Sequence, residues 1–165
     1  MARKAGVGIG TLYRHFPTRH ALFEALYRRE VQHLCDLAGS LMNEASPSEA
    51  LRQWLKSNVE FVATKKGMST ALALAVDSSS DLTTSSLEQL TRAVGLLLTR
   101  AVDTGEIRAD IGPEDLLRAL IGMCYMHDRH GWQDSVLRML DVFVDGLRVG
   151  ASHLRKSVRV AADKE

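Results

Sequence analysis

The sequence predicts an all-α protein, and three observations support this fold class. Only three prolines occur, at positions 17, 47 and 113, and each stands where a helix could begin. Apolar residues recur at spacings of three and four, and the alternation typical of strands is nowhere sustained. With 165 residues, 45% of them hydrophobic and 25% charged, the chain has the composition of a globular domain, which argues against a disordered or fibrous class.

The first half of the chain is expected to contain two long helices and a short one. Thr18 can cap a helix that runs to about Met42. The sequence "SPSE", residues 46–49, matches a capping box and predicts a second helix to about Thr64. Gly67 then precedes a short apolar helix over residues 68–76. The polar stretch "DSSSDLTTSS", residues 77–86, predicts a loop.

The second half is expected to contain three helices. The first covers residues 87–102 and ends before Gly105, which suits a left-handed C-cap. The second begins at Gly112-Pro113, with two acids in its first turn, and ends at Gly131. The third covers residues 132–154. The tail, 155–165, lacks an apolar stripe and is expected to fray.

Charge and cysteine content limit the class of protein further. The net charge is +1, but residues 1–30 hold six basic and two acidic residues, a net +4, so the remainder carries −3. Cys35 and Cys124 are far apart and form no C-x-x-C motif, so no disulfide framework or zinc site is expected. No apolar run is long enough for a membrane span, and no secretory signal follows the basic N-terminus. We therefore expect a cytoplasmic protein without a membrane partner, cofactor or metal.

The segment at residues 6–16 has the pattern of a helix-turn-helix. Gly6 and Gly8 permit a tight turn, and residues 9–16 form a short helix in which Leu12 and Phe16 share the inward side. A helix with polar and basic side chains on its outer face suits a DNA major groove, although an ordinary surface helix has the same pattern. The candidate DNA-contacting residues are Gly10, Thr11, Tyr13, Arg14, His15 and Arg19, the last of these placed to hold a backbone phosphate.

The stretch "AGVGIGTLYRHFPTRHALFEAL", residues 5–26, closely resembles the recognition helix and the following helix of the tetracycline-repressor (TetR) family of transcriptional regulators. Two later stretches, "GEIRADIGPEDLLRALIGM" and "GWQDSVLRMLDVFVDGLR", resemble that family's C-terminal region. The resemblance implies a homodimer that binds a double-stranded DNA operator and is released by a small apolar or amphipathic molecule. It also places Ile9 among the DNA contacts, whereas the helical wheel turns Ile9 inward.

The same resemblance divides the chain into three parts. Residues 1–43 correspond to a partial helix-turn-helix region with its connecting helix, 44–154 to a ligand-binding and dimerisation domain, and 155–165 to the tail. Family members carry a first helix and most of a second before this point, so we expect a truncated helix-turn-helix. Exposure of Leu12 and Phe16 would then cost about 2–3 kcal/mol and weaken DNA binding. The alternative is an all-α ligand- or partner-binding dimer that does not bind DNA.

The resemblance also indicates where a ligand and a second subunit would bind. Adaptable methionines and aromatic residues line apolar pockets, although the same residues at helical spacing often only fill a core. The pocket candidates are Trp54, Phe61, Met68, Leu72, Met123, Met126 and His127. The last two helices resemble the family's dimer-forming pair, although packing within the chain could equally cover their apolar stripe. The dimer candidates are Leu117, Ile121, Val136, Leu140, Phe143, Val144 and Leu147.

One further motif, "MHDRHG" at residues 126–131, suggests a metal-dependent hydrolase because His127 and Asp128 are adjacent. A working metal site needs three or more converging ligands, and neighbours on a helix point about 100° apart. No second segment fixes the missing ligands, and no nucleophile motif such as G-x-S-x-G occurs. We therefore expect no enzymatic activity and no catalytic residue.

Overall fold

The computed structural model describes residues 14–72, 81–126 and 131–150, with the side chains of 71 and 72 excepted. These ranges contain α2 (Arg19–Glu44), α3 (Pro47–Leu72), α4 (Asp81–Asp103), α5 (Pro113–Tyr125) and α6 (Trp132–Leu147). No strand occurs in them beyond one isolated bridge. The all-α fold class is therefore confirmed. None of the described helices is both long and apolar enough to cross a membrane.

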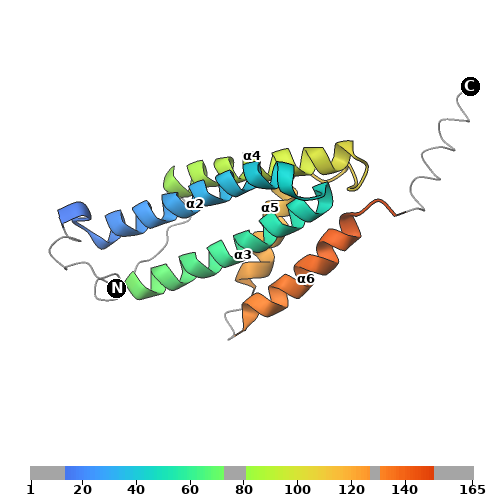
Figure 1. The fold of residues 1–165 in the computed structure, drawn as a ribbon. Helices are drawn as coiled ribbons and strands as arrows, with labels where there is room; N and C mark the ends of the chain where they lie inside the picture. The colour runs from blue at the N-terminus through green and yellow to red at the C-terminus, as the bar shows by residue number, and fades with distance from the viewer. Residues whose placement is uncertain (1–13, 73–80, 127–130, 151–165) are drawn as a thin grey trace, which may run out of the picture.

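The helices pack around one shared core (Figure 1). α2 contacts both α3 and α4, α6 runs along α3, and α5 crosses behind α3 to contact α4 and α6. Part of this core lies where α2 meets α3. There the fully buried Trp54 donates its indole N–H to the Leu34 carbonyl over 2.8 Å, which fixes the register of the two helices.

α2 begins and ends close to its predicted bounds. The Thr18 backbone is extended, and its Oγ1 accepts from the Ala21 N–H at 3.0 Å, which satisfies a free amide of the first turn. A stripe of side chains at spacings of three and four then faces α3 and α4. It consists of Phe23, Tyr27, Val31, Leu34, Ala38 and Leu41.

α3 is longer than predicted, and its start is held differently. Gly67 does not interrupt the helix, because Met68 remains buried and the roughly 1 kcal/mol cost of a helical glycine is small beside continued packing. The predicted capping box is wrong. The Ser48 N–H donates to Glu106 Oε2 at 3.0 Å, and the Glu49 carboxylate contacts Gln53 and Arg52.

α4 begins six residues before the predicted position, so residues 81–86 are helical rather than part of a loop. Asp81 lies in the first turn, where the helix dipole favours an acid, and Ser86 is buried against the core. Local composition predicted a loop there, but packing decides the structure. At the other end Gly105 has φ +73°, the left-handed conformation that the sequence predicted.

α5 and α6 are both shorter than predicted. α5 ends at Tyr125, and residues 127–130 lie outside the described part of the chain. α6 ends at Leu147 because the chain then pairs with the segment after α4. The Arg108 N–H donates to the Leu147 carbonyl and the Val149 N–H to the Glu106 carbonyl, each at 3.0 Å. The prediction of helix as far as residue 154 is therefore wrong over 148–150, and the tail at 155–165 is not described.

Arg52 joins α3 to α6. Its side chain is only 12% exposed, and Nη1 donates to the Asp141 carboxylate at 2.8 Å and to the Asp141 carbonyl at 3.2 Å. Nη2 pairs with Asp145 one turn further along α6. Lys56 also contacts Asp141, at 2.8 Å. These contacts hold α6 against the outer side of α3.

Candidate functional site

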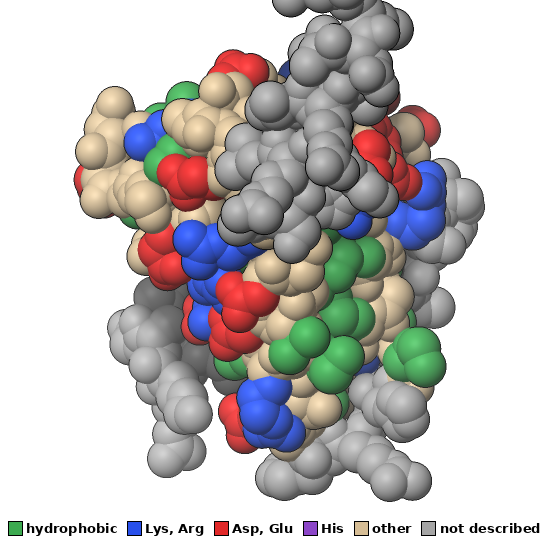
Figure 2. Space-filling view, turned by 90° about the vertical axis from the view of Figure 1, so that its right-hand side faces the viewer, with side chains coloured by type: hydrophobic (Ala, Val, Ile, Leu, Met, Phe, Trp, Pro, Cys, Tyr) green, Lys and Arg blue, Asp and Glu red, His purple; other side chains and the backbone are tan. Residues whose placement is uncertain are grey.

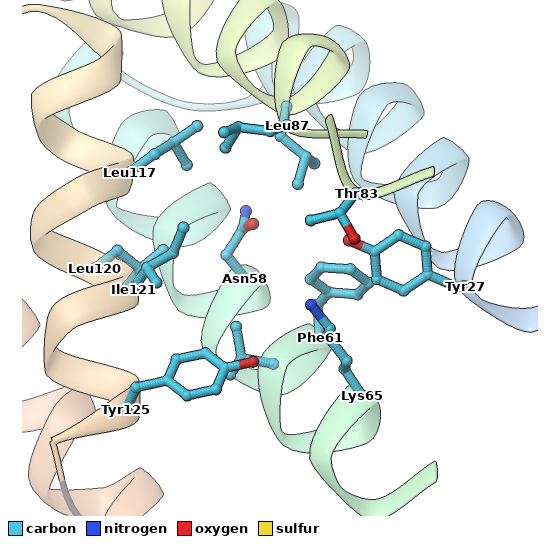
Figure 3. Close-up of a pocket in the computed structure, with 12 residues that line it drawn as sticks. Tyr27, Asn58, Phe61, Lys65, Thr83, Leu87, Leu117, Leu120, Ile121 and Tyr125 are labelled. Atoms are coloured by element: carbon cyan, nitrogen blue, oxygen red, sulfur yellow. The ribbon is translucent and has the colours of Figure 1, made fainter. Parts of the chain in front are cut away.

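A cavity of about 370 Å³ lies between α2, α3, α4 and α5 (Figure 3). This volume falls within the range of small-molecule sites in proteins. Each of the four helices contributes side chains to the wall. The lining residues are Tyr27, Asn58, Phe61, Val62, Lys65, Thr83, Leu87, Leu90, Leu117, Leu120, Ile121 and Tyr125.

One end of the cavity carries polar groups. In Figure 3 the Lys65 ammonium, Thr83 and the Tyr27 hydroxyl lie on one side, and Tyr125 points toward them from α5. Lys65 Nζ lies 5.2 Å from the centroid of the Tyr27 ring, within the range of a cation–π contact. Burial lowers the pKa of Lys65, because an apolar environment penalises the charged amine.

Tyr27 connects this polar end to α2. Its ring stacks on Phe23 at a centroid distance of 5.8 Å and meets Phe61 of α3 at 5.3 Å. Burial raises the pKa of Tyr27, opposed by a hydrogen bond with the buried Ser86 of α4. The phenol is therefore neutral near pH 7. One side chain on α2 thus contacts the cavity, α3 and α4 together.

The opposite end is aliphatic. Leu87 of α4 and Leu117, Leu120 and Ile121 of α5 surround it in Figure 3. Asn58 lies between the two ends, and its Nδ2 donates to the Trp54 carbonyl at 3.1 Å. The cavity therefore has a polar end and an apolar end, an arrangement that suits an amphipathic molecule better than a uniformly polar or apolar one.

The predicted pocket residues are distributed over the fold. The structure places Phe61 on the cavity wall, while Trp54 is a core residue whose N–H is already bonded to Leu34. Met68 is buried and Met123 half-buried away from the lining, and Met126 is 74% exposed. The Leu72 side chain and His127 lie outside the described residues. Helical periodicity identified apolar positions correctly but could not distinguish those that face the core from those that face a cavity.

Several lining residues were missed by sequence reasoning. Tyr27 and Lys65 belong to ordinary amphipathic stretches and carry no motif, and Thr83 lay in a predicted loop. The only available signal was a lysine on a helix side with apolar neighbours, a pattern that is usually solvated. Leu117 and Ile121, predicted at a dimer interface, line the cavity, and Ile121 is also 40% exposed.

The other dimer candidates also face inward for the most part. Val136, Leu140, Val144 and Leu147 are buried in the chain's own core, so they are not free to contact a second subunit, and Phe143 is partly buried against the same core. The exposed apolar side chains of α6 are Met139 and Val142, at 54% and 65% exposure. Figure 2 shows hydrophobic side chains gathered in a band on one face of the molecule, next to acidic and basic ones.

The predicted DNA-contacting residues lie at the N-terminal end of α2. Arg14 and His15 are helical and exposed, and Arg19, also exposed, is the first residue of α2. Gly10, Thr11 and Tyr13 lie outside the described residues, as do Ile9 and Leu12. Phe16 is half-buried. The two described basic side chains and the imidazole are thus accessible on the same short stretch.

The histidine and aspartate of "MHDRHG" cannot be placed, since residues 127–130 lie outside the described part of the chain. Within the described ranges, no three His, Cys, Asp or Glu side chains gather as a metal site would require. Burial raises the pKa of the Cys124 thiol to about 11, so it is protonated near neutral pH and unsuited to act as a nucleophile or metal ligand.

Two family matches cover most of the chain. Residues 46–149 match the family described as "Transcriptional regulator SbtR-like, C-terminal domain", and residues 1–26 match "Bacterial regulatory proteins, tetR family". A search of curated proteins gives no match.

Solved structures with similar folds are also regulators. The TetR transcriptional regulator SCO0520 from Streptomyces coelicolor is 43% identical, with a TM-score of 0.79 over 91% of this chain and 86% of that one. A TetR transcription regulatory protein from Mycobacterium vanbaalenii is 32% identical, with a TM-score of 0.67 over 90% and 80%. The TetR family regulator PfmR from Thermus thermophilus, at 18% identity and a TM-score of 0.60 over 90% and 84%, shares the fold.

Proposed function

Because the chain belongs to the TetR family of bacterial transcriptional regulators, we propose that it is a homodimeric repressor that binds an operator and is released by a small molecule in the described cavity. Family members are DNA-binding regulators rather than enzymes. We therefore propose no catalytic residue for this chain. We place its activity in the cytoplasm, where bacterial operator DNA lies.

One observation carries the proposal, namely that the cavity wall includes Tyr27 of α2. α2 begins at Arg19, about two helical turns before Tyr27, and Arg14 and His15 lie a few residues before its start. A ligand that displaces the Tyr27 ring would therefore move the helix on which the DNA-contacting segment is mounted. A ligand shifts such an equilibrium only through contacts that differ between the two states, and Tyr27 provides one.

Charge supports DNA binding at this end. The exposed Arg14 and Arg19 can neutralise phosphates, and the exposed His15 can reach a base edge. Gly10, Thr11 and Tyr13 complete the proposed contact set by their positions in the matched family segment. We propose that phosphate contacts set the orientation and that the short helix carries the sequence preference.

We propose that the dimer forms through the exposed apolar side of α6. Met139 and Val142 on this helix are exposed large hydrophobic residues. A two-fold interface would bring the same patch from each subunit together and remove these side chains from water.

A gel-shift assay tests the proposed function. The chain, and the same chain extended upstream in frame, are mixed with DNA that flanks the gene at a fixed salt concentration. We expect a sequence-specific complex that Arg14→Ala and Arg19→Ala weaken, while Arg118→Ala, an exposed residue on α5, leaves it unchanged. Absence of a complex with either form would favour the alternative, a ligand- or partner-binding dimer that does not bind DNA.

A further inference from the structure

We propose that the cavity binds a small amphipathic carboxylate, with the carboxylate at Lys65 and the apolar chain between the aliphatic side chains of α4 and α5. The proposal rests on the proposed function, in which this cavity is the ligand site. It adds the chemical class of the ligand, which neither the family nor the similar structures specify.

Lys65 carries a charge that the described part of the chain does not neutralise. No carboxylate in that part forms an ion pair with its ammonium, which lies over the Tyr27 ring at 5.2 Å from the centroid. Desolvation alone shifts the pKa of Lys65, downward, which agrees with the absence of a nearby acid. A cation held at the edge of an apolar cavity gains most from an anion that enters the cavity.

The number of basic side chains at the cavity sets how much negative charge a ligand can carry there. Among the described side chains that line this cavity, Lys65 is the only basic one. The adjacent Lys66 is turned away, since its Nζ donates to the Cys124 carbonyl at 2.9 Å and lies over the rings of Tyr125 and Trp132. One cation matches one negative charge, so a carboxylate fits better than a phosphate, and a ligand cation would be repelled.

The aliphatic end of the cavity suits the remaining, apolar part of the ligand. Leu87, Leu117, Leu120 and Ile121 face the end opposite Lys65, so a chain that starts at the ammonium runs into an aliphatic space. Each methylene buried there raises affinity by roughly fourfold. The neutral phenol of Tyr27, described above, adds no negative charge beside the carboxylate.

The test compares three probes that share one alkyl chain. Decanoate, decanol and decylamine are titrated by calorimetry into the full chain near neutral pH, below the concentration at which they form micelles. We expect decanoate to bind about tenfold to a hundredfold more tightly than decanol, the range for a hydrogen bond to a charged group, and decylamine to bind most weakly.

Variants then assign the preference to one residue. Lys65→Met should abolish the preference for decanoate while leaving the affinity for decanol unchanged or improved. Lys65→Arg should retain the preference. Lys56→Met is the matched control, because Lys56 is on the same helix but contacts Asp141, away from the cavity. Decanol binding by Lys65→Met also shows that this variant is folded.

Three outcomes would overturn the proposal: decanol or decylamine binding as tightly as decanoate, a preference that survives in Lys65→Met, or no binding by any probe. Failure of the proposed function is separate, because it appears in the gel shift as the absence of a complex with flanking DNA. Tight decanoate binding without such a complex would support the carboxylate site and refute the repressor.

Discussion

Tyr27 links the cavity to α2, the helix that follows the proposed DNA-contacting segment, so replacing its ring should have a large and specific effect. Tyr27→Leu removes two aromatic contacts, to Phe23 and Phe61, each contributing about 0.5–1.5 kcal/mol beyond the area buried. It also removes the Lys65 contact, which contributes about 0.5–1 kcal/mol. With about 1 kcal/mol more for the loss of the hydroxyl, we expect the free energy of unfolding to fall by about 2.5–5 kcal/mol.

Tyr27→Phe is the matched control because it keeps the ring and removes only the hydroxyl. Its hydrogen bond with buried Ser86 is lost, so we expect a decrease of about 1 kcal/mol. Urea denaturation at one fixed protein concentration measures both variants, since the stability of the proposed dimer would depend on concentration. Variants whose unfolding free energies agree within about 0.5 kcal/mol would refute the assignment of the ring contacts.

Three further predictions concern the other contacts. Arg52→Met should lower the free energy of unfolding by about 1–2 kcal/mol in urea denaturation. This value is discounted because the carboxylates that Arg52 contacts are substantially exposed. The control Arg118→Met loses only a contact within α5 and should change the free energy of unfolding by less than about 0.5 kcal/mol. Lys56 and Arg52 lower the pKa of Asp141 in the folded protein. The stabilising contribution of Asp141 is therefore present above its unfolded pKa, near 4, and is lost as the pH falls through the lower folded pKa. The stability of Asp141→Asn should depend less steeply on pH in acid unfolding, and equal slopes for the variant and the original chain would contradict this. Arg19→Ala should weaken binding to all DNA sequences alike. In anisotropy titrations it should reduce the slope of log affinity against log salt concentration by about 0.9. An unchanged slope would mean that Arg19 contacts no phosphate.

Local signals predicted the ends of some helices well. Thr18 and Gly105 act through their own backbone neighbourhood, one by accepting an amide hydrogen bond and the other by adopting positive φ, so their roles can be recognised without the rest of the fold. Gly67 and the stretch at 81–86 were assigned wrongly because packing outweighs local preference there. The end of α6 depends on hydrogen bonds with Glu106 and Arg108, which lie more than three dozen residues earlier in the chain. The local sequence around residue 147 does not indicate this pairing.

The candidate site was harder to predict than the fold. Periodicity showed that Trp54, Leu117 and Leu140 are apolar helix positions, but whether each meets the core, a cavity or a second subunit depends on how the helices are placed. Trp54 and Leu140 pack fully in the core, while Leu117 reaches the cavity. Lys65 was missed because a single lysine on an amphipathic helix has no signature until its surroundings are known.

The central claim is that the cavity and the proposed DNA-contacting segment are coupled. The most direct test measures decanoate affinity with and without saturating flanking DNA. Coupling between two sites is reciprocal, so a ligand that releases DNA must itself bind more weakly to the DNA complex. We predict a dissociation constant about 5-fold to 150-fold higher in the presence of operator DNA, and no change with DNA of unrelated sequence. Equal affinity in the free protein and in the operator complex would show that the cavity does not control DNA binding.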